Sequence, residues 1–190
     1  MHIIAGTARN TVLAVPPGIG VRPTAGRARK ALFDSIGYRI PDSAVLDLCA
    51  GSGALGLECA SRKALSITLI ESNLQHLSVI EENIARVKKC GVNCEFFVIG
   101  ANVELIADYI EKIPVPNLIF ADPPYSKSAE MFKHLIGDER FCTFVAGALL
   151  IWEIPDSPGS VGEFINSPRL VDSQIRRFGG TDFLLGEIQI

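Results

Sequence analysis

The chain has 190 residues, 48% of them hydrophobic, a length that suits one well-buried domain and is short for two. Its 18 basic and 21 acidic residues give a formal net charge of −3, which as a total points to no particular partner. No apolar run approaches membrane-spanning length and the opening MHIIAGTARN lacks the apolar core of a signal peptide, so we expect a soluble, cytoplasmic protein with no membrane partner.

The charge is unevenly distributed along the chain. Residues 1–39 carry six basic side chains against one acidic side chain, a formal charge of +5, and the remaining 151 residues carry −8. A basic arm on an acidic body is a candidate footprint for a polyanion. The five cysteines are odd in number and scattered, and their one C-x-x-x-C pair has no nearby histidine, so we expect free thiols and no metal site.

The first predicted elements belong to this basic arm. Loose alternation over residues 2–15 predicts a small β-hairpin, which Pro16-Pro17-Gly18 ends. A helix follows with Thr24 as its N-cap, and its apolar side is formed by Ala28, Ala31, Leu32 and Ile36. We expect residues 1–39 to be an extension of the single domain that occupies residues 40–190.

From Val45 onward, predicted strands and helices alternate, which is typical of a parallel sheet covered by helices. The strands are expected at 45–48, 66–70, 95–99, 117–121 and 148–154, and the helices between them include 74–89, 102–110 and 128–136. The two runs 169–178 and 183–190 flank Gly179-Gly180 and predict a closing hairpin. The expected fold is therefore α/β with a seven-stranded mixed sheet.

The most informative stretch is 44–57, which reads AVLDLCAGSGALGL. An apolar strand leads into a G-x-G-x-x-G turn that starts at Gly51, and such turns let a ligand approach bare backbone at a helix start. Glu71 lies twenty positions past Gly51 at the end of the next strand, where a carboxylate can accept hydrogen bonds from both ribose hydroxyls. The pattern predicts a nucleoside-bearing cofactor.

Asp47 distinguishes between two such cofactors. It ends the strand four residues before Gly51, where its charge would repel the pyrophosphate of NAD and attract the ammonium and sulfonium of S-adenosylmethionine. The alternative is that Asp47 only caps the turn or accepts a hydrogen bond from a loop amide, and that Glu71 is a solvated strand end.

A second chemical motif, Asp122-Pro123-Pro124-Tyr125, follows an apolar strand at the edge where open α/β sheets bind ligands. The prolines stiffen the backbone and donate no N–H, so the carboxylate and carbonyls form a rigid group of acceptors beside an aromatic ring. This arrangement suits an exocyclic amine of a nucleobase stacked on Tyr125. A proline-rich turn with a structural tyrosine is the alternative.

The runs D-L-C-A-G-S-G-A-L-G-L-E, D-P-P-Y and R-P-T-x-x-R-x-R-K-x-L-F together resemble the RsmD family of bacterial methyltransferases that act on guanine N2 of 16S ribosomal RNA. The resemblance covers nearly the whole chain in order. It implies a Rossmann-like class I S-adenosylmethionine-dependent fold, with 16S ribosomal RNA in small-subunit particles as the partner. Separately, we expect a monomer.

The resemblance also implies roles for single residues. Cofactor contacts would come from Thr24, Asp47, Ala50, Gly51, Gly53, Glu71, Ala101 and Asn102. The catalytic group would be Asp122, Pro123, Pro124 and Tyr125, and the RNA would meet Arg9, Arg22, Arg27, Arg29 and Lys30. The chain departs from the family where Gly100-Ala101-Asn102 replaces the usual Asp or Asn that reaches the adenine amine, and where Lys30 replaces an acid.

Three other functions use some of the same features. An adenine N6 methyltransferase acting on DNA or another RNA would share the D-P-P-Y chemistry, although 190 residues leave little room for reading a base sequence. A non-catalytic RNA-binding module would have no need of the intact cofactor and D-P-P-Y residues. An NAD oxidoreductase is disfavoured by Asp47 and by the isolation of the three histidines.

Overall fold

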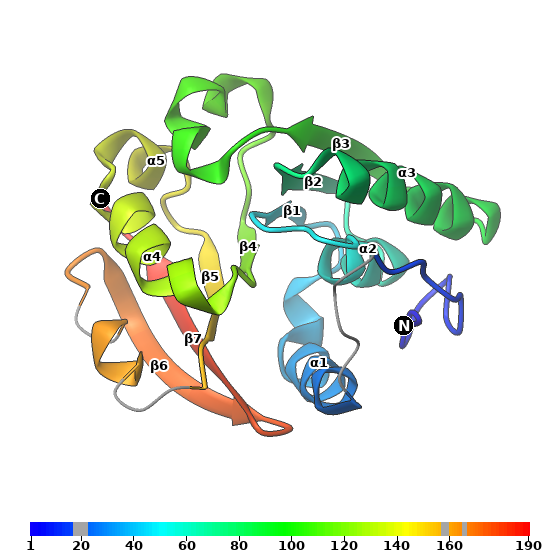
Figure 1. Cartoon of the computed structure of the whole chain (residues 1–190), viewed down its shortest axis with the longest axis horizontal. Helices are drawn as coiled ribbons and strands as arrows, with labels where there is room; N and C mark the ends of the chain where they lie inside the picture. Colours follow the sequence, from blue (N-terminus) through cyan, green and yellow to red (C-terminus); the bar gives the residue numbers. More distant parts are fainter. Residues whose placement is uncertain (17–22, 157–159, 165–166) are drawn as a thin grey trace.

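The computed structural model describes residues 1–16, 23–156, 160–164 and 167–190, without the side chains of residues 23–25, 160 and 163. Its centre is a seven-stranded sheet in the order β3-β2-β1-β4-β5-β7-β6 (Figure 1). The first five strands in this order are mutually parallel, and β7 pairs antiparallel with both β5 and β6. The predicted mixed sheet is therefore confirmed. Its strands are β1 Ala44–Asp47, β2 Ser66–Glu71, β3 Glu95–Gly100, β4 Leu118–Ala121, β5 Leu149–Ile154, β6 Leu170–Phe178 and β7 Thr181–Ile188.

Helices cover both faces of the sheet (Figure 1). One face carries the helices α1 Pro23–Ile36, α2 Ala54–Ser61 and α3 Leu74–Lys89. The other carries α4 Ser128–Gly137 and α5 Glu139–Phe144 together with the 3-10 helices η2 Val103–Asp108 and η3 Ile110–Lys112. Three further 3-10 segments are η1 Gly37–Arg39, η4 Tyr125–Lys127 and η5 Ser160–Glu163.

The two faces create two hydrophobic cores, and strand alternation divides the side chains between them. In β4, Leu118 and Phe120 join the core under α1 to α3, whereas Ile119 and Ala121 join the core under α4 and α5. Because the central strands are buried on both sides, they appear in the sequence as continuous apolar runs. Within the described ranges, no helix is long and apolar enough to cross a membrane.

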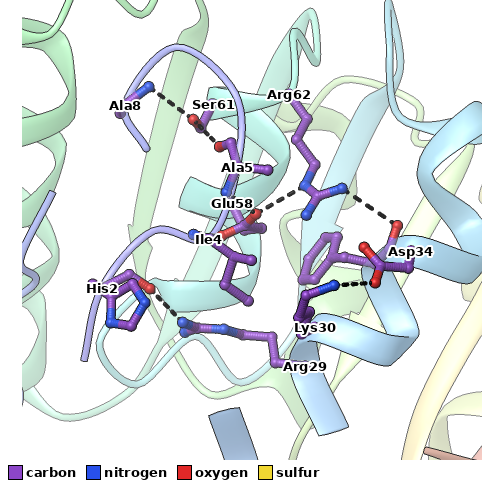
Figure 2. A network of polar contacts seen from close by, with 11 residues as sticks. His2, Ile4, Ala5, Ala8, Arg29, Lys30, Asp34, Glu58, Ser61 and Arg62 are labelled. Carbon is purple, nitrogen blue, oxygen red and sulfur yellow. Dashed lines mark hydrogen bonds and ion pairs between the residues drawn. The ribbon is translucent and has the colours of Figure 1, made fainter. Parts of the chain in front are cut away.

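The N-terminal segment is less regular than the predicted hairpin. Its two arms pair as in a hairpin, with the N–H of Ile3 donating to the carbonyl of Thr11 at 3.0 Å, but within this segment only one antiparallel bridge forms, between His2 and Val12. Glu58 of α2, fully buried, accepts hydrogen bonds from the N–H groups of Ile4 and Ala5 at 2.7 and 3.0 Å and also pairs with Arg62 (Figure 2). Residues 1–14 and α1 thus share one hydrophobic core with α2 and α3.

Two other local predictions need correction. Helix α1 begins at Pro23, so Thr24 lies in its first turn and is not the N-cap; proline suits this position because the N–H it lacks has no helical partner. The helix predicted over 102–110 is instead a pair of 3-10 segments, η2 and η3, and η2 is itself kinked at Leu105, which has φ −101° and ψ 17°. The short helix α5 was not predicted.

The predicted C-terminal hairpin is confirmed, and its tip packs against α1. Gly179 and Gly180 have φ values of 55° and 95°, as a two-residue type I′ turn requires. A Cβ at Gly179 would lie only 2.5 Å from the backbone nitrogen of Ala28, so the turn approaches the α1 backbone more closely than any other residue type allows.

Candidate active site

A cleft of about 720 Å³ opens at the carboxyl edge of the sheet, where the strand order changes direction between β1 and β4. Ligands of open α/β proteins bind at this switch point because the loops leaving the two strands diverge there. The cleft brings together nine of the predicted site residues: Ala50, Gly51, Glu71, Ala101, Asn102, Asp122, Pro123, Pro124 and Tyr125.

The glycine turn forms one wall of the cleft. Gly51 and Gly53 have φ values of 56° and 77°, and the N–H of Gly53 donates to the carbonyl of Ala50 at 2.7 Å. Gly56 lets α2 lie against the sheet, because a Cβ there would come within 2.7 Å of the Ile67 side chain. The turn therefore needs its glycines for backbone conformation and for close helix packing.

Asp47 lies behind this turn and does not line the cleft. Its side chain is buried, with Oδ2 accepting a hydrogen bond from the N–H of Gly56 at 3.2 Å. Oδ1 has no hydrogen-bond partner among the described residues. Burial raises the pKa of Asp47 to about 7 although the Gly56 N–H lowers it, and the charges of Asp122 and Glu71 add to the rise. A cation in the cleft would offset this cost of burying charge.

Glu71 holds the glycine turn in place. Its Oε2 accepts a hydrogen bond from the N–H of Gly51 at 2.9 Å, and its Oε1 accepts one from the N–H of Asn73 at 2.8 Å. The Nδ1 atom of His76 lies 3.4 Å from the same carboxylate. Glu71 is thus fixed at the cleft edge, where its remaining acceptor positions can meet hydroxyl groups.

The loop after β3 supplies the next side of the cleft. Asn102 caps η2 by accepting a hydrogen bond from the N–H of Glu104 at 3.1 Å, and its Nδ2 donates to the Glu104 carboxylate. The N–H of Ala101 donates to the carbonyl of Ile99 at 3.1 Å. Both candidates for the adenine contact therefore line the cleft while they already have partners within the protein.

The D-P-P-Y run follows β4 directly and faces the glycine turn. The carbonyl of Pro124 accepts a hydrogen bond from the N–H of Lys127 at 2.9 Å, which begins η4. The Tyr125 hydroxyl donates to Glu153 of β5 at 3.2 Å, and 39% of the tyrosine surface is exposed. The hydrogen bond of its hydroxyl holds the aromatic ring at the cleft mouth.

The structure separates the five predicted RNA-binding residues. Arg27 and Lys30 are exposed on α1, and Lys30 pairs with Asp34 at 2.5 Å. Arg29 is only 9% exposed and donates to the carbonyl of His2, and burial lowers its pKa, so it joins α1 to the N-terminal segment instead of facing solvent (Figure 2).

Arg9 is exposed, but it lies in the loop that binds Ser61, at the end of α2 remote from the cleft. Arg22 lies outside the described residues, and so does the side chain of Thr24. Of the predicted cations that the structure describes, the α1 residues Arg27 and Lys30 remain the candidates for an RNA surface.

Several cleft residues were absent from the sequence-based set: Met1, Cys49, Ser52, His76, Glu104, Lys127 and Met131. Cys49 follows the conspicuous Asp47 by two residues, and burial raises the pKa of its thiol, so it is an unreactive wall residue. Glu104 and Lys127 belong to no sequence motif, and only the fold of the loops after β3 and β4 shows that they line the cleft. The cleft lining holds the carboxylates of Glu71, Glu104 and Asp122, which favour a cationic ligand.

Several proteins resemble this chain in sequence and fold. "Ribosomal RNA small subunit methyltransferase D" of Escherichia coli is 36% identical over 127 residues, which cover 67% of this chain and 61% of that protein. The Haemophilus influenzae protein of the same name is 32% identical over 125 residues, covering 66% and 64%. The chain thus matches somewhat less than two thirds of the length of these relatives.

A solved structure extends the similarity over the whole fold. The Escherichia coli protein described as "Putative methyltransferase yhhF" superposes with a TM-score of 0.71 at 26% identity, covering 100% of this chain and 98% of that one. The family model described as "Conserved hypothetical protein 95" matches residues 1–160. The chain therefore belongs to this family, which is the RsmD family that its motifs indicated.

Proposed function

We propose that the protein transfers a methyl group from S-adenosylmethionine to the exocyclic N2 amine of a guanine in 16S ribosomal RNA. The observation that carries this proposal is one carboxylate-lined cleft that joins the glycine turn and Glu71 to the D-P-P-Y run. The names of the relatives, which specify ribosomal RNA of the small subunit, support the substrate class.

The cleft residues fit the cofactor. Glu71, Glu104 and Asp122 make the cleft acidic, and behind the glycine turn Asp47 adds a buried carboxylate whose Oδ1 has no hydrogen-bond partner among the described residues. When bound, S-adenosylmethionine supplies an electrophilic methyl group on a sulfonium. Glu71 would hold the ribose hydroxyls, the Gly51 turn would receive the methionine part, and Ala101 or Asn102 would meet the adenine.

The D-P-P-Y run would position the base. The Asp122 carboxylate and the Pro123 carbonyl would accept the two N–H groups of the guanine amine, so that its lone pair faces the cofactor. Tyr125, fixed by Glu153, would stack on the base. Because a paired base is inaccessible, the target would be a loop nucleotide or one flipped out of the stack, in folded 16S RNA within a small-subunit particle.

Two measurements test this proposal. S-adenosylmethionine or its demethylated product should raise the melting temperature, whereas NAD should not, because the cleft repels a pyrophosphate. Stabilisation by NAD alone would contradict the cofactor assignment. In single-turnover methyl transfer to small ribosomal subunits, Asp122→Ala should lower the rate at least about a hundredfold with cofactor affinity unchanged.

A further inference from the structure

The C-terminal hairpin brings two unassigned arginines to the edge of the sheet that carries the active site. Ala121, the last residue of β4, is level with Trp152 of β5, and Trp152 is level with Leu184 of β7. Two residues further on, Ile154 pairs with Asp182, which also faces Arg177 of β6. The hairpin tip therefore lies just beyond the same carboxyl edge as the D-P-P-Y run.

Arg176 and Arg177 present their charges on the two sides of this edge. Arg176 is exposed and stacks its guanidinium over the Phe178 ring, 5.0 Å from the centroid, and Phe178 belongs to the core shared with α1. Arg177 points to the opposite face by strand alternation and pairs with Asp182 at 3.1 Å. Side chains of that pair are 60% and 25% exposed, so a phosphate can compete for Arg177 at little cost.

The tip also adjoins the basic helix. Gly179 lies against the backbone of Arg27 and Ala28. A Cβ atom built on Gly179 would lie only 2.5 to 2.8 Å from backbone atoms of these two residues, so the close contact requires glycine. This contact places the exposed Arg27 beside the tip that carries Arg176. Three cations from distant parts of the sequence thus gather at one end of the molecule, although the chain as a whole has a charge of −3.

The spacing to the base-binding motif suits a nucleic-acid strand. Three strand spacings separate β4 from β6 in the sheet, or roughly 14 Å at about 4.8 Å each. A stacked strand advances roughly 3.4 Å per nucleotide, so this distance corresponds to about four nucleotides. A strand that places a base on Tyr125 therefore carries phosphates within reach of the hairpin tip.

We propose that Arg176 and Arg177 of the β6–β7 hairpin, together with Arg27 of α1, form a phosphate-binding surface for the RNA strand that flanks the target nucleotide. The inference rests on the proposed function and adds to Arg27 two residues of the RNA interface, Arg176 and Arg177, that no motif marks. The stacking of Arg176 on Phe178 holds its guanidinium in place before the RNA arrives, which limits the conformational entropy lost on binding.

The test is a salt titration of binding to deproteinised 16S ribosomal RNA by the double variant Arg176→Gln, Arg177→Gln. The matched control is Arg9→Gln, Lys63→Gln, which removes two exposed cations near the C-terminal end of α2, remote from the cleft. Losing two phosphate contacts should flatten the slope of log affinity against log salt by about 1.4 on single strands and about 1.8 on duplex. The control should keep the wild-type slope.

An unchanged slope in the hairpin variant, or an equal change in the control, would overturn the inference. Methyl transfer to small subunits by the wild-type protein is measured on the same preparations. If the wild-type protein transfers methyl groups but the hairpin variant keeps the wild-type salt slope, only the proposed phosphate-binding surface is contradicted. A hairpin-dependent slope without any wild-type transfer would support the RNA surface and contradict the proposed enzyme activity.

Discussion

Replacing Asp47 with asparagine tests whether the protein keeps a buried carboxylate at the cost of its own stability. The folded protein raises the pKa of this group from 3.8 to about 7, chiefly through burial. A group with a raised pKa in the folded state makes its full contribution at low pH, and stability is lost as pH rises from the unfolded toward the folded pKa. The asparagine side chain of the variant would keep an oxygen to accept the Gly56 N–H but would never ionise.

The magnitude follows from the two pKa values. Between pH 5 and pH 8 the wild-type carboxyl should lose about 2 to 3 kcal/mol of folding free energy that the Asp47→Asn variant does not lose. Any fixed cost of burying the extra amide N–H groups cancels in this comparison across pH. For a chain of this size the change corresponds to roughly 5 to 10 °C in melting temperature.

The assay is urea unfolding of both proteins at several pH values without cofactor. The stability of Asp47→Asn relative to the wild type should rise steadily from pH 5 to pH 8, while its stabilisation by S-adenosylmethionine should be weaker at pH 8. A stability difference that stays constant with pH would refute the claim that Asp47 is a buried, costly charge. If the stability difference does change with pH but S-adenosylmethionine stabilises the variant as strongly as the wild type, then Asp47 does not contribute to the cofactor site.

Other substitutions test separate parts of the molecule. Tyr125→Phe should methylate at nearly the wild-type rate, since the ring and not the hydroxyl stacks on the base. Tyr125→Ala should lose about 1 to 3 kcal/mol of transition-state stabilisation, measured by competition kinetics. Equal rates for the two variants would argue against stacking. Glu71→Ala should weaken cofactor affinity in calorimetry by at least about tenfold, and undiminished affinity would exclude it as the ribose ligand. Gly179→Ala should separate the hairpin tip from α1 and weaken RNA binding while cofactor affinity stays constant, and normal RNA affinity would count against that contact. Glu58→Ala should lower the free energy of unfolding by about 3 to 5 kcal/mol and speed proteolysis of residues 1–14; an unaltered proteolysis rate would mean that Glu58 does not anchor this segment.

The sheet could be predicted from the sequence because its strands are buried on both faces and separated by strong turn signals. β4 appears as the apolar run Leu118–Ala121 and stops at a proline pair, and the C-terminal hairpin is marked by two consecutive glycines. The 3-10 structure of residues 103–112 was not predictable, because the apolar side chains of η2 and η3 recur at spacings compatible with an α-helix.

The cleft was predictable in outline, whereas burial of individual charges was not. Arg27, Arg29 and Lys30 look equivalent on one basic helix, yet Arg29 is buried because the carbonyl of His2, far away in sequence, meets its guanidinium. Asp47 does not line the cleft, because its carboxylate accepts a hydrogen bond from the N–H of Gly56 behind the glycine turn. Such outcomes depend on tertiary contacts that residue patterns do not contain.

The central claim is most directly tested by identifying the methylated base. The protein is incubated with labelled S-adenosylmethionine and small ribosomal subunits that lack the modification, with Asp122→Ala as the control, and the RNA is then digested to nucleosides for chromatography. The proposed geometry predicts label in N2-methylguanosine from 16S RNA and almost none with the variant. Label in N6-methyladenosine would contradict the assignment of the base, and the absence of label in any nucleoside would contradict the proposed activity itself.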